Sequence, residues 1–387
     1  MADAEGSSRA SVRQALVDLS VKYQFAADNA ASDWQDEERE PTEDDRTRKI
    51  EVFDKLHSSL LPSIKHHLSC LVTSLDLEHR PSNHPTPNLG LTLETLSSLD
   101  HTLDQIIVDF GHLHVPLPPV AHDHPLDRCK RFRSDQLISN ISDLIQDPIR
   151  STFLYCSDFI QLWELSTDQP ESIGLQTSVS YSAETVLDGI TEATNLVNKI
   201  LRFSQLSDLD ILQEQWQEKA ESLDGILEGL TELTNSAIGH RRPLSAVRKS
   251  MLNETRLDIT LVKLLRTLYD KVSKPTIKKL AFKLDPDVDS ESLSIMHTAP
   301  ETTDGSLLIH LHFLLENFKN DQSNGETADR KISKSRISRR AESMLLPIGL
   351  YLIPLPSSVD HHSSPARDFK AWLIMWQTLW HTAINRY

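Results

Sequence analysis

Four histidines around a proline-rich stretch are the side chains whose type and spacing come closest to a metal site. They form two His-x-His pairs, His112 with His114 and His122 with His124. Imidazole nitrogens bind Zn²⁺ and Cu²⁺, and the four histidines would be enough to coordinate such an ion if the stretch folded back on itself. The pairs lack the i, i+4 spacing of helical ligands and a nearby cysteine pair. We therefore interpret them as surface histidines and predict no metal ion.

A run of cations near the C-terminus is a second candidate, here for binding an anion. It surrounds Ser333, Ser335 and Ser338, and this composition is typical of a nuclear-import signal or of a patch regulated by phosphorylation. The simpler interpretation is the solvated face of a helix. The candidate residues are Arg330, Lys331, Lys334, Arg336, Arg339 and Arg340.

The sign of the charge reverses in the second half of the chain. Residues 184–232 hold eleven acidic and three basic side chains, whereas residues 241–283 hold twelve basic and three acidic ones. A segment as basic as the second could contact the phosphates of nucleic acid or lipid. Its leucine stripe and the acidic helices before it favour charge pairing within the molecule instead.

Motifs of the common enzyme classes are absent from the sequence. It contains no His-Glu-x-x-His, no Glu-x-x-His pair, no phosphate-binding glycine loop and no Gly-x-Ser-x-Gly elbow. Glycine is scarce, with 11 residues in 387, although nucleotide-binding α/β folds need glycines at fixed positions. We expect no catalytic residue, no cofactor and no enzyme activity, unless residues distant in sequence assemble a site.

Two apolar helices near the N-terminus organise the rest of the chain. In residues 50–75 and 89–113, large apolar residues recur at three- and four-residue steps, so each helix carries one apolar stripe. Pro81, Pro85 and Pro87 prevent one continuous helix. The pair is therefore predicted to form an antiparallel hairpin whose stripes face a shared core.

Further apolar stripes predict the other helices of the chain. One of these helices should kink or break near Asp147, because Pro148 lies inside it. The basic helix has apolar residues over a wide arc, which predicts burial on more than one side. The expected helices cover residues 11–27, 134–165, 182–203, 207–238, 244–272, 307–318, 331–346 and 366–387.

Loops are expected at residues 166–180 and 285–305, and a short helix between Pro275 and Leu284. Prolines in residues 348–355 predict an extended segment there. Gly225 and Gly229 favour close packing of a neighbouring helix, and His310 and His312 are interpreted as solvated. The last helix should dock on the core through Phe369, Trp372, Trp376, Leu379 and Ala383.

The hairpin also carries a family resemblance. Its segments LLPSIK (residues 60–65), residues 71–77, HPTPNL (84–89) and SLDHTLDQI (98–106) resemble an all-helical family expanded in rust fungi. Residues 372–387 are similar to the end of that family. The resemblance implies a helical fold and brings with it no activity, ligand or catalytic residue.

Composition narrows the classes of partner and the compartment. The net charge of -16 opposes general affinity for nucleic acid and membranes. Cys70, Cys129 and Cys156 are odd in number and far apart, which is typical of reduced thiols inside cells. No secretory signal and no run of about 18 apolar residues is present. We expect a protein of the cytoplasm or nucleus without a membrane span.

These patterns predict an all-α protein, an antiparallel helical bundle of about eight or nine helices built either as one elongated domain or as two packed bundles. The predicted segments are a mobile acidic N-terminus (1–48), an N-terminal bundle (49–240), a basic helical segment (241–320), a flexible basic linker (321–345), and an extended segment with the tryptophan-rich docking helix (346–387).

The predicted function is that of a non-catalytic helical scaffold or adaptor that binds protein partners. This follows from the fold class and from the missing catalytic motifs, and it identifies neither a partner nor an oligomeric state. The alternative is binding of anionic nucleic acid or lipid through residues 241–283 and 330–340, which would depend steeply on salt.

Overall fold

Helices make up almost all of the described chain, so the predicted all-α fold is confirmed. The computed structural model describes residues 2–24, 42–78, 85–113, 123–238, 245–273, 281–320, 327–355 and 364–386. The chain divides into two compact units, residues 1–205 and 206–387. The N-terminal bundle was expected to extend to residue 240, but the helix that begins at Asp208 packs within the second unit, against α10 (Ala246–Val272) and α11 (Ser290–Asn320).

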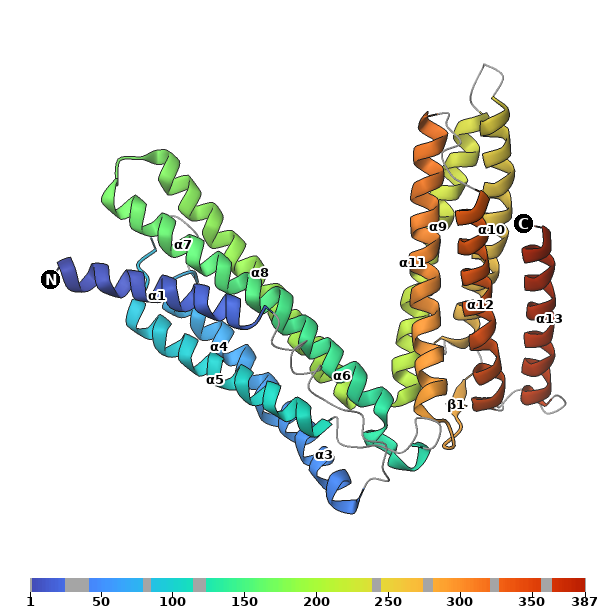
Figure 1. Cartoon of the computed structure of the whole chain (residues 1–387), viewed down its shortest axis with the longest axis horizontal. Coiled ribbons are helices and arrows are strands. Elements are labelled where there is room, and N and C mark those ends of the chain that lie inside the picture. Colours follow the sequence, from blue (N-terminus) through green and yellow to red (C-terminus); the bar gives the residue numbers. More distant parts are fainter. Residues whose placement is uncertain are drawn as a thin grey trace. The chain divides into compact units, whose positions relative to one another are not determined.

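The first unit is a set of helices around a single apolar core (Figure 1). The hairpin of α4 and α5 and the hairpin of α7 and α8 pack together, and α1 lies on α5 and α7. The predicted loop at 166–180 is much shorter, because α8 begins at Ile173. The elements are α1 (Ala2–Lys22), α3 (Glu43–Lys55), η1 (Leu56–Leu60), α4 (Leu61–Ser74), α5 (Leu89–Leu113), η3 (His124–Cys129), α6 (Arg131–Leu144), η4 (Ile145–Ile149), α7 (Arg150–Asp168) and α8 (Ile173–Gln205).

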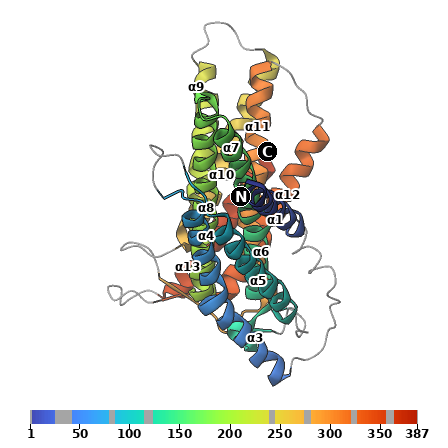
Figure 2. The same cartoon turned by 90° about the vertical axis from the view of Figure 1, so that its left-hand side faces the viewer.

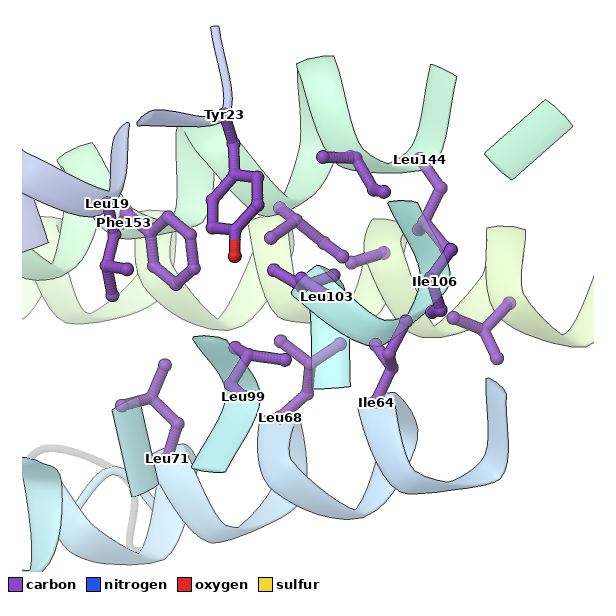
Figure 3. Close-up of a cluster of buried hydrophobic side chains, with 14 of the residues drawn as sticks. Leu19, Tyr23, Ile64, Leu68, Leu71, Leu99, Leu103, Ile106, Leu144 and Phe153 are labelled. Atoms are coloured by element: carbon purple, nitrogen blue, oxygen red, sulfur yellow. The ribbon is translucent and has the colours of Figure 1, made fainter. Parts of the chain in front are cut away.

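The predicted hairpin of residues 50–75 and 89–113 is present, and its stripes are the centre of the core. Leu68 of α4 lies beside Leu99 and Leu103 of α5, and all three side chains are fully buried (Figure 3). Large apolar side chains lose contact with water here, which is the main favourable contribution to folding. The spacing of the leucines therefore identified the core correctly.

Two prolines each accompany a π-helical turn in the first unit. Pro148 lies inside the π-helical turn η4, and Pro62 is the second residue after the π-helical turn η1. Proline has no backbone N–H and its ring crowds the preceding turn, so a locally wider turn relieves the conflict without ending the helix. At the position near Asp147 where a kink or break was predicted, the structure has the π-helical turn η4.

Tyr23, just after α1, fixes the N-terminal helix to α5. Its ring is buried against Phe153, and its hydroxyl lies 2.7 Å from Oδ1 of Asp100 and 3.0 Å from Oδ1 of Asp104 (Figure 3). Lys22 pairs with the same two carboxylates from the surface. The buried hydroxyl is held by charged acceptors, which makes this contact stronger than a neutral hydrogen bond.

Replacing Tyr23 with phenylalanine is expected to lower the stability of the first unit by about 1–3 kcal/mol, because a buried charge-assisted hydrogen bond is lost. Hydrogen exchange of the α1 amides should become faster. Lys22→Met is the matched control: the lysine is partly exposed, and its loss should cost about 1 kcal/mol or less. Equal effects of the two changes would contradict the role given to the tyrosine.

The second unit is a bundle of long helices (Figures 1 and 2), and it also contains a two-stranded sheet. The strands are antiparallel, and Lys283 pairs with Ile353. A short helix was expected between Pro275 and Leu284, but residues 282–284 form the strand β1. An extended segment was expected at residues 348–355, but α12 continues to Tyr351 and the strand β2 covers only residues 352–354. The elements are α9 (Asp208–Ile238), α10 (Ala246–Val272), β1 (Phe282–Leu284), α11 (Ser290–Asn320), α12 (Thr327–Tyr351), β2 (Leu352–Pro354) and α13 (Pro365–Arg386).

A tryptophan explains why the predicted loop at 285–305 is helical from Ser290 onward. Pro300 lies inside α11 and cannot donate to the carbonyl of Met296, four residues earlier. That buried carbonyl accepts a hydrogen bond of 3.0 Å from Nε1 of Trp216 on α9 instead. The interhelical bond satisfies the group that the proline leaves open, so the helix continues.

The last helix docks on α10 and α12 as predicted, but its buried face differs from the predicted one. Trp372 is half-buried, whereas its neighbour Leu373 is buried. Phe369, Trp376 and Ala383 are buried, whereas Leu379 is half exposed and Trp380 takes its place in the core. Nε1 of Trp376 donates to the carbonyl of Leu264 on α10 at 2.8 Å, and its ring stacks on Trp380.

Candidate functional site

Two of the four histidines weighed as metal ligands lie in the part of the chain that the structure describes. His112 at the end of α5 is half-buried, His124 in η3 is exposed, and His114 and His122 lie outside the described residues. No group of three or more histidine, cysteine or acidic side chains within the described ranges could hold a metal ion. His310, expected to be solvated, is mostly buried instead, with Nε2 3.1 Å from Oδ2 of Asp258.

The cationic run lies on α12. Arg336, Arg339 and Arg340 are exposed on this helix, while the side chains of Arg330, Lys331 and Lys334 lie outside the described ones. The hydroxyl of Ser338 donates to Oε1 of Glu342 at 2.6 Å. The exposure of the three arginines agrees with a solvated helix face and equally with an anion-binding site. The cationic run therefore stays a candidate for binding an anion.

Several cationic side chains of the basic helix α10 contact other helices of the second unit. Arg266 pairs with Asp224 of α9 at 2.6 Å, and Arg248 donates to the carbonyl of Phe318 on α11. The ammonium of Lys271 lies over the ring of Trp372 on α13. These contacts agree with the predicted charge pairing within the molecule, although Arg266–Asp224 is an exposed pair of small energetic value.

The close packing predicted at the two glycines of α9 is present at one of them. A Cβ atom on Gly229 would lie 3.0 Å from Cδ2 of Leu311 on α11, whereas one on Gly225 would meet nothing within 4 Å. Only Gly229 therefore allows a neighbouring helix to approach.

A buried lysine defines the most unusual chemical environment in the first unit. Lys49 on α3 is 2% exposed, and its ammonium nitrogen has no hydrogen-bond partner among the described residues. The charged groups that act on it are Cys129 in η3 together with Asp123, Arg131 and Asp135 around the start of α6. We call these five residues the Lys49 cluster.

Burial decides the chemistry of this lysine. Removal from water lowers the pKa of Lys49 to about 8, and the nearby acidic groups only partly oppose this effect. Asp123 is fully buried and accepts a hydrogen bond of 2.9 Å from the backbone N–H of Arg131, so its carboxylate also caps α6. Near neutral pH the lysine therefore supplies both an ammonium ion and a fraction of neutral amine, which is a nucleophile.

A second polar cluster is buried between α9, α10 and α11. Ser222 donates to Oδ2 of Asp304 at 3.0 Å, while Oδ1 of Asp304 has no partner among the described residues. Burial raises the pKa of Asp304 above its ordinary value. The hydroxyl of Tyr269 lies near Thr303 without forming a hydrogen bond of good geometry, and burial raises its pKa as well. Groups perturbed in this way are found in active sites and in structural networks alike.

Replacing Tyr269 with phenylalanine is expected to leave the second unit as stable or up to about 1 kcal/mol more stable, because a buried hydroxyl without a good partner is removed. Ser222→Ala should do the opposite and cost about 1–2 kcal/mol, since Asp304 then loses its donor. Urea unfolding of the two variants measures both effects. A clear loss of stability in the tyrosine variant would reveal a partner or a bound molecule at its hydroxyl.

Neither cluster could be predicted from the sequence, because the members of each cluster come from distant segments of the chain. Lys49 and Cys129 are far apart in the chain, and neither lies in a recognisable motif. The position of Lys49 one turn before the apolar stripe residues Val52 and Phe53 was the single available signal. A lysine inside an apolar helical face is uncommon and indicates a special environment.

The described residues form an all-α fold made of two helical units. Residues 49–205 match the model of a domain of unknown function, DUF8723, and residues 207–387 match that of a second domain of unknown function, DUF8721. The two matches meet where the two units divide. No curated protein and no solved structure matches the chain. None of the described helices is long and apolar enough to span a bilayer.

Proposed function

We propose that this protein is a non-catalytic helical scaffold or adaptor that binds a partner protein, and that α12 and α13 carry the contact. The observation behind this proposal is a set of large apolar side chains left exposed on these helices. Leu346 and Leu350 of α12 are 68% and 59% exposed, and Ile374 of α13 is 64% exposed. Exposed apolar groups that gather in one place are typical of binding surfaces.

These three residues belong to two helices that approach each other closely. A Cβ atom on Gly349 would lie 3.2 Å from Cδ2 of Leu373, so α12 and α13 are in direct contact there. Leu346 and Leu350 flank this glycine in sequence, and Ile374 follows the leucine. We call Leu346, Leu350 and Ile374 the apolar patch. An apolar segment of a partner, such as the stripe of an amphipathic helix, is the chemistry that fits it.

The test is co-purification of the intact protein from its own cells, followed by mass spectrometry. The patch variant Leu350→Ser/Ile374→Ser is compared with the wild type and with a charge variant in which Arg336, Arg339 and Arg340 become alanine. A defined protein partner that is lost only from the patch variant supports the proposal. A partner retained by the patch variant contradicts it, provided that circular dichroism shows the same helix content.

The alternative function is binding of anionic nucleic acid or lipid through residues 241–283 and 330–340. The exposure of Arg336, Arg339 and Arg340 supports it, whereas the internal contacts of Arg248, Arg266 and Lys271 reduce the cations that remain available. Nucleic acid or lipid that is lost only from the charge variant, and whose binding weakens steeply with salt, would favour this alternative.

Two further expectations belong to the same proposal. The chain acts in the cytoplasm or nucleus, and its resemblance to the helical family expanded in rust fungi extends to both units. The matches to two domains of unknown function fit that resemblance, since neither brings an activity with it.

A further inference from the structure

The outward face of α4 carries a histidine and a cysteine one helical turn apart. They are His66 and Cys70, and the sulfur of Cys70 lies 3.6 Å from Nε2 of His66. His66 is exposed and Cys70 is half-buried, whereas the other two cysteines, Cys129 and Cys156, are buried. Cys70 is therefore the thiol of this chain that a dissolved ion reaches most easily.

Helical geometry directs both side chains away from the core of the first unit. Successive residues of an α-helix are rotated by about 100°, so positions 66 and 70 each lie about 160° from position 68 around the helix. Leu68 is fully buried and points into the core (Figure 3). His66 and Cys70 consequently share the opposite face. Residues with this i, i+4 spacing are neighbours on a helix, and helical zinc ligands use the same spacing.

We propose that His66 and Cys70 bind one Zn²⁺ ion on the surface of α4, with water in the remaining coordination positions. The proposal is independent of the adaptor function. An imidazole nitrogen and a thiolate sulfur are both ligands that zinc takes in proteins. The soft sulfur ligand selects against Mg²⁺ and Ca²⁺, which prefer oxygen ligands.

The separation of the two ligand atoms fits a tetrahedral ion. Zn–S bonds are about 2.3 Å and Zn–N bonds about 2.0–2.1 Å long, so two such ligands at the tetrahedral angle lie about 3.5 Å apart. The sulfur of Cys70 and Nε2 of His66 are 3.6 Å apart. Binding thus needs little movement of either side chain. The thiol gives up its proton to the solvent, and the ion then binds both the sulfur and the nitrogen.

Two nearby histidines are engaged elsewhere. The ring of His67 lies 5.7 Å from that of His66 between centroids, but its Nε2 is 3.3 Å from the hydroxyl of Thr102 on α5. Nε2 of His101, also on α5, is 2.8 Å from the side-chain nitrogen of Gln105. In the described part of the chain no three histidine, cysteine or acidic side chains form a metal site, so we assign two protein ligands to this ion.

A bound ion has two measurable consequences for the protein. It connects Nε2 of His66 to the sulfur of Cys70 across one turn of α4 and so restrains that turn as a helix. Because the unfolded chain does not hold the two ligands together, binding favours the folded state and should raise the thermal midpoint of the first unit. The ion also occupies the thiolate, which is the form of cysteine that alkylating reagents attack.

The experiment adds Co²⁺ and then Zn²⁺ to the intact reduced protein. Co²⁺ occupies tetrahedral zinc sites, and a thiolate bound to it gives a charge-transfer absorption. We expect this absorption to saturate at one ion per chain and to disappear when Zn²⁺, which binds such ligands more tightly, is added. Peptide mapping after treatment with iodoacetamide should show that Zn²⁺ slows the modification of Cys70 several-fold.

Three variants make the test specific, and circular dichroism checks that each keeps its helix content. Cys70→Ser should lose the charge-transfer absorption, and His66→Ala should lose saturation at one ion per chain. In both variants Zn²⁺ should no longer raise the thermal midpoint. His101→Ala removes an exposed imidazole from the same unit and should behave like the wild type.

Four results would overturn the proposal. The absorption could be absent from the wild type, or it could persist in Cys70→Ser. His66→Ala and His101→Ala could bind Co²⁺ equally well, which would exclude His66 as a ligand. A stoichiometry of one ion for two chains would show that a second copy, and not water, completes the coordination.

Discussion

Replacing Trp376 with alanine is expected to lower the free energy of unfolding of the second unit by about 3–5 kcal/mol, the range for truncating a large buried aromatic side chain. The indole ring is 2% exposed, stacks on Trp380 with 5.4 Å between ring centroids, and donates to the carbonyl of Leu264. The change removes the packing of α13 on α10 and leaves a buried carbonyl without its donor. Urea unfolding followed by circular dichroism measures the loss, and hydrogen exchange should show α13 opening first.

Two neighbouring positions serve as controls. Leu379→Ala lies on the same helix but at an exposed position, so its effect should stay within about 0.5 kcal/mol. Trp380→Phe removes an indole N–H that has no hydrogen-bond partner in the described part of the chain. It should therefore cost less than Trp376→Phe, which loses the bond to Leu264. If Trp376→Ala were no worse than Leu379→Ala, the docking of α13 through this face would be wrong.

Lys49→Met is expected to stabilise the first unit at pH 7 by up to about 3 kcal/mol, since each unit of pKa shift corresponds to about 1.4 kcal/mol. The pKa of this lysine falls from 10.5 to about 8 on folding. Below pH 8 the lysine is charged in both states, and the folded state carries the full cost of burying the ammonium. Between pH 8 and 10.5 the unfolded state binds more protons, so the stability of the wild type rises with pH.

The variant lacks this titration. The difference in unfolding free energy between the variant and the wild type should therefore shrink as the pH rises from 8 toward 10.5 and be constant below pH 8. Lys55→Met is a suitable reference, because Lys55 lies on the same helix, is partly exposed and pairs with Asp109 at 2.8 Å. A loss of stability at pH 7 in the Lys49 variant would show that the ammonium is held by interactions stronger than its burial.

The sequence was sufficient for the helices and their buried stripes because these depend on local periodicity. The stripe of α4 that contains Leu68 and the stripe of α5 that contains Leu99 and Leu103 both follow from three- and four-residue spacing alone. The errors arose where a distant group changed the local outcome. Pro300 would end most helices, yet α11 continues because Trp216 from another helix satisfies the open carbonyl of Met296. No local pattern contains that information.

The two clusters were beyond the sequence for the same reason. Lys49 follows the acidic N-terminal segment, and its burial depends on η3 and α6, which lie far along the chain. Asp304 falls in the loop predicted at residues 285–305, whereas the structure places it within α11, where its side chain is buried. The sequence predicted Leu379 in the buried face of the last helix, where the structure has Trp380. An error of one residue in such a prediction rotates the expected face by about 100° around the helix.

The two π-helical turns keep the apolar stripes in angular phase. Four residues turn an ideal α-helix about 40° beyond a full rotation, so repeated four-residue steps drift around its surface. The buried residues Leu137, Ile141, Ile145, Ile149 and Phe153 form such a series, and a uniform α-helix would spread them over about 160°. The wider turn at Ile145–Ile149 uses more residues per rotation and cancels much of this drift. A continuous series of four-residue steps beside a proline therefore indicates a local change of helical pitch. Because of this change, the consecutive helices α6, η4 and α7 keep the same face toward the core.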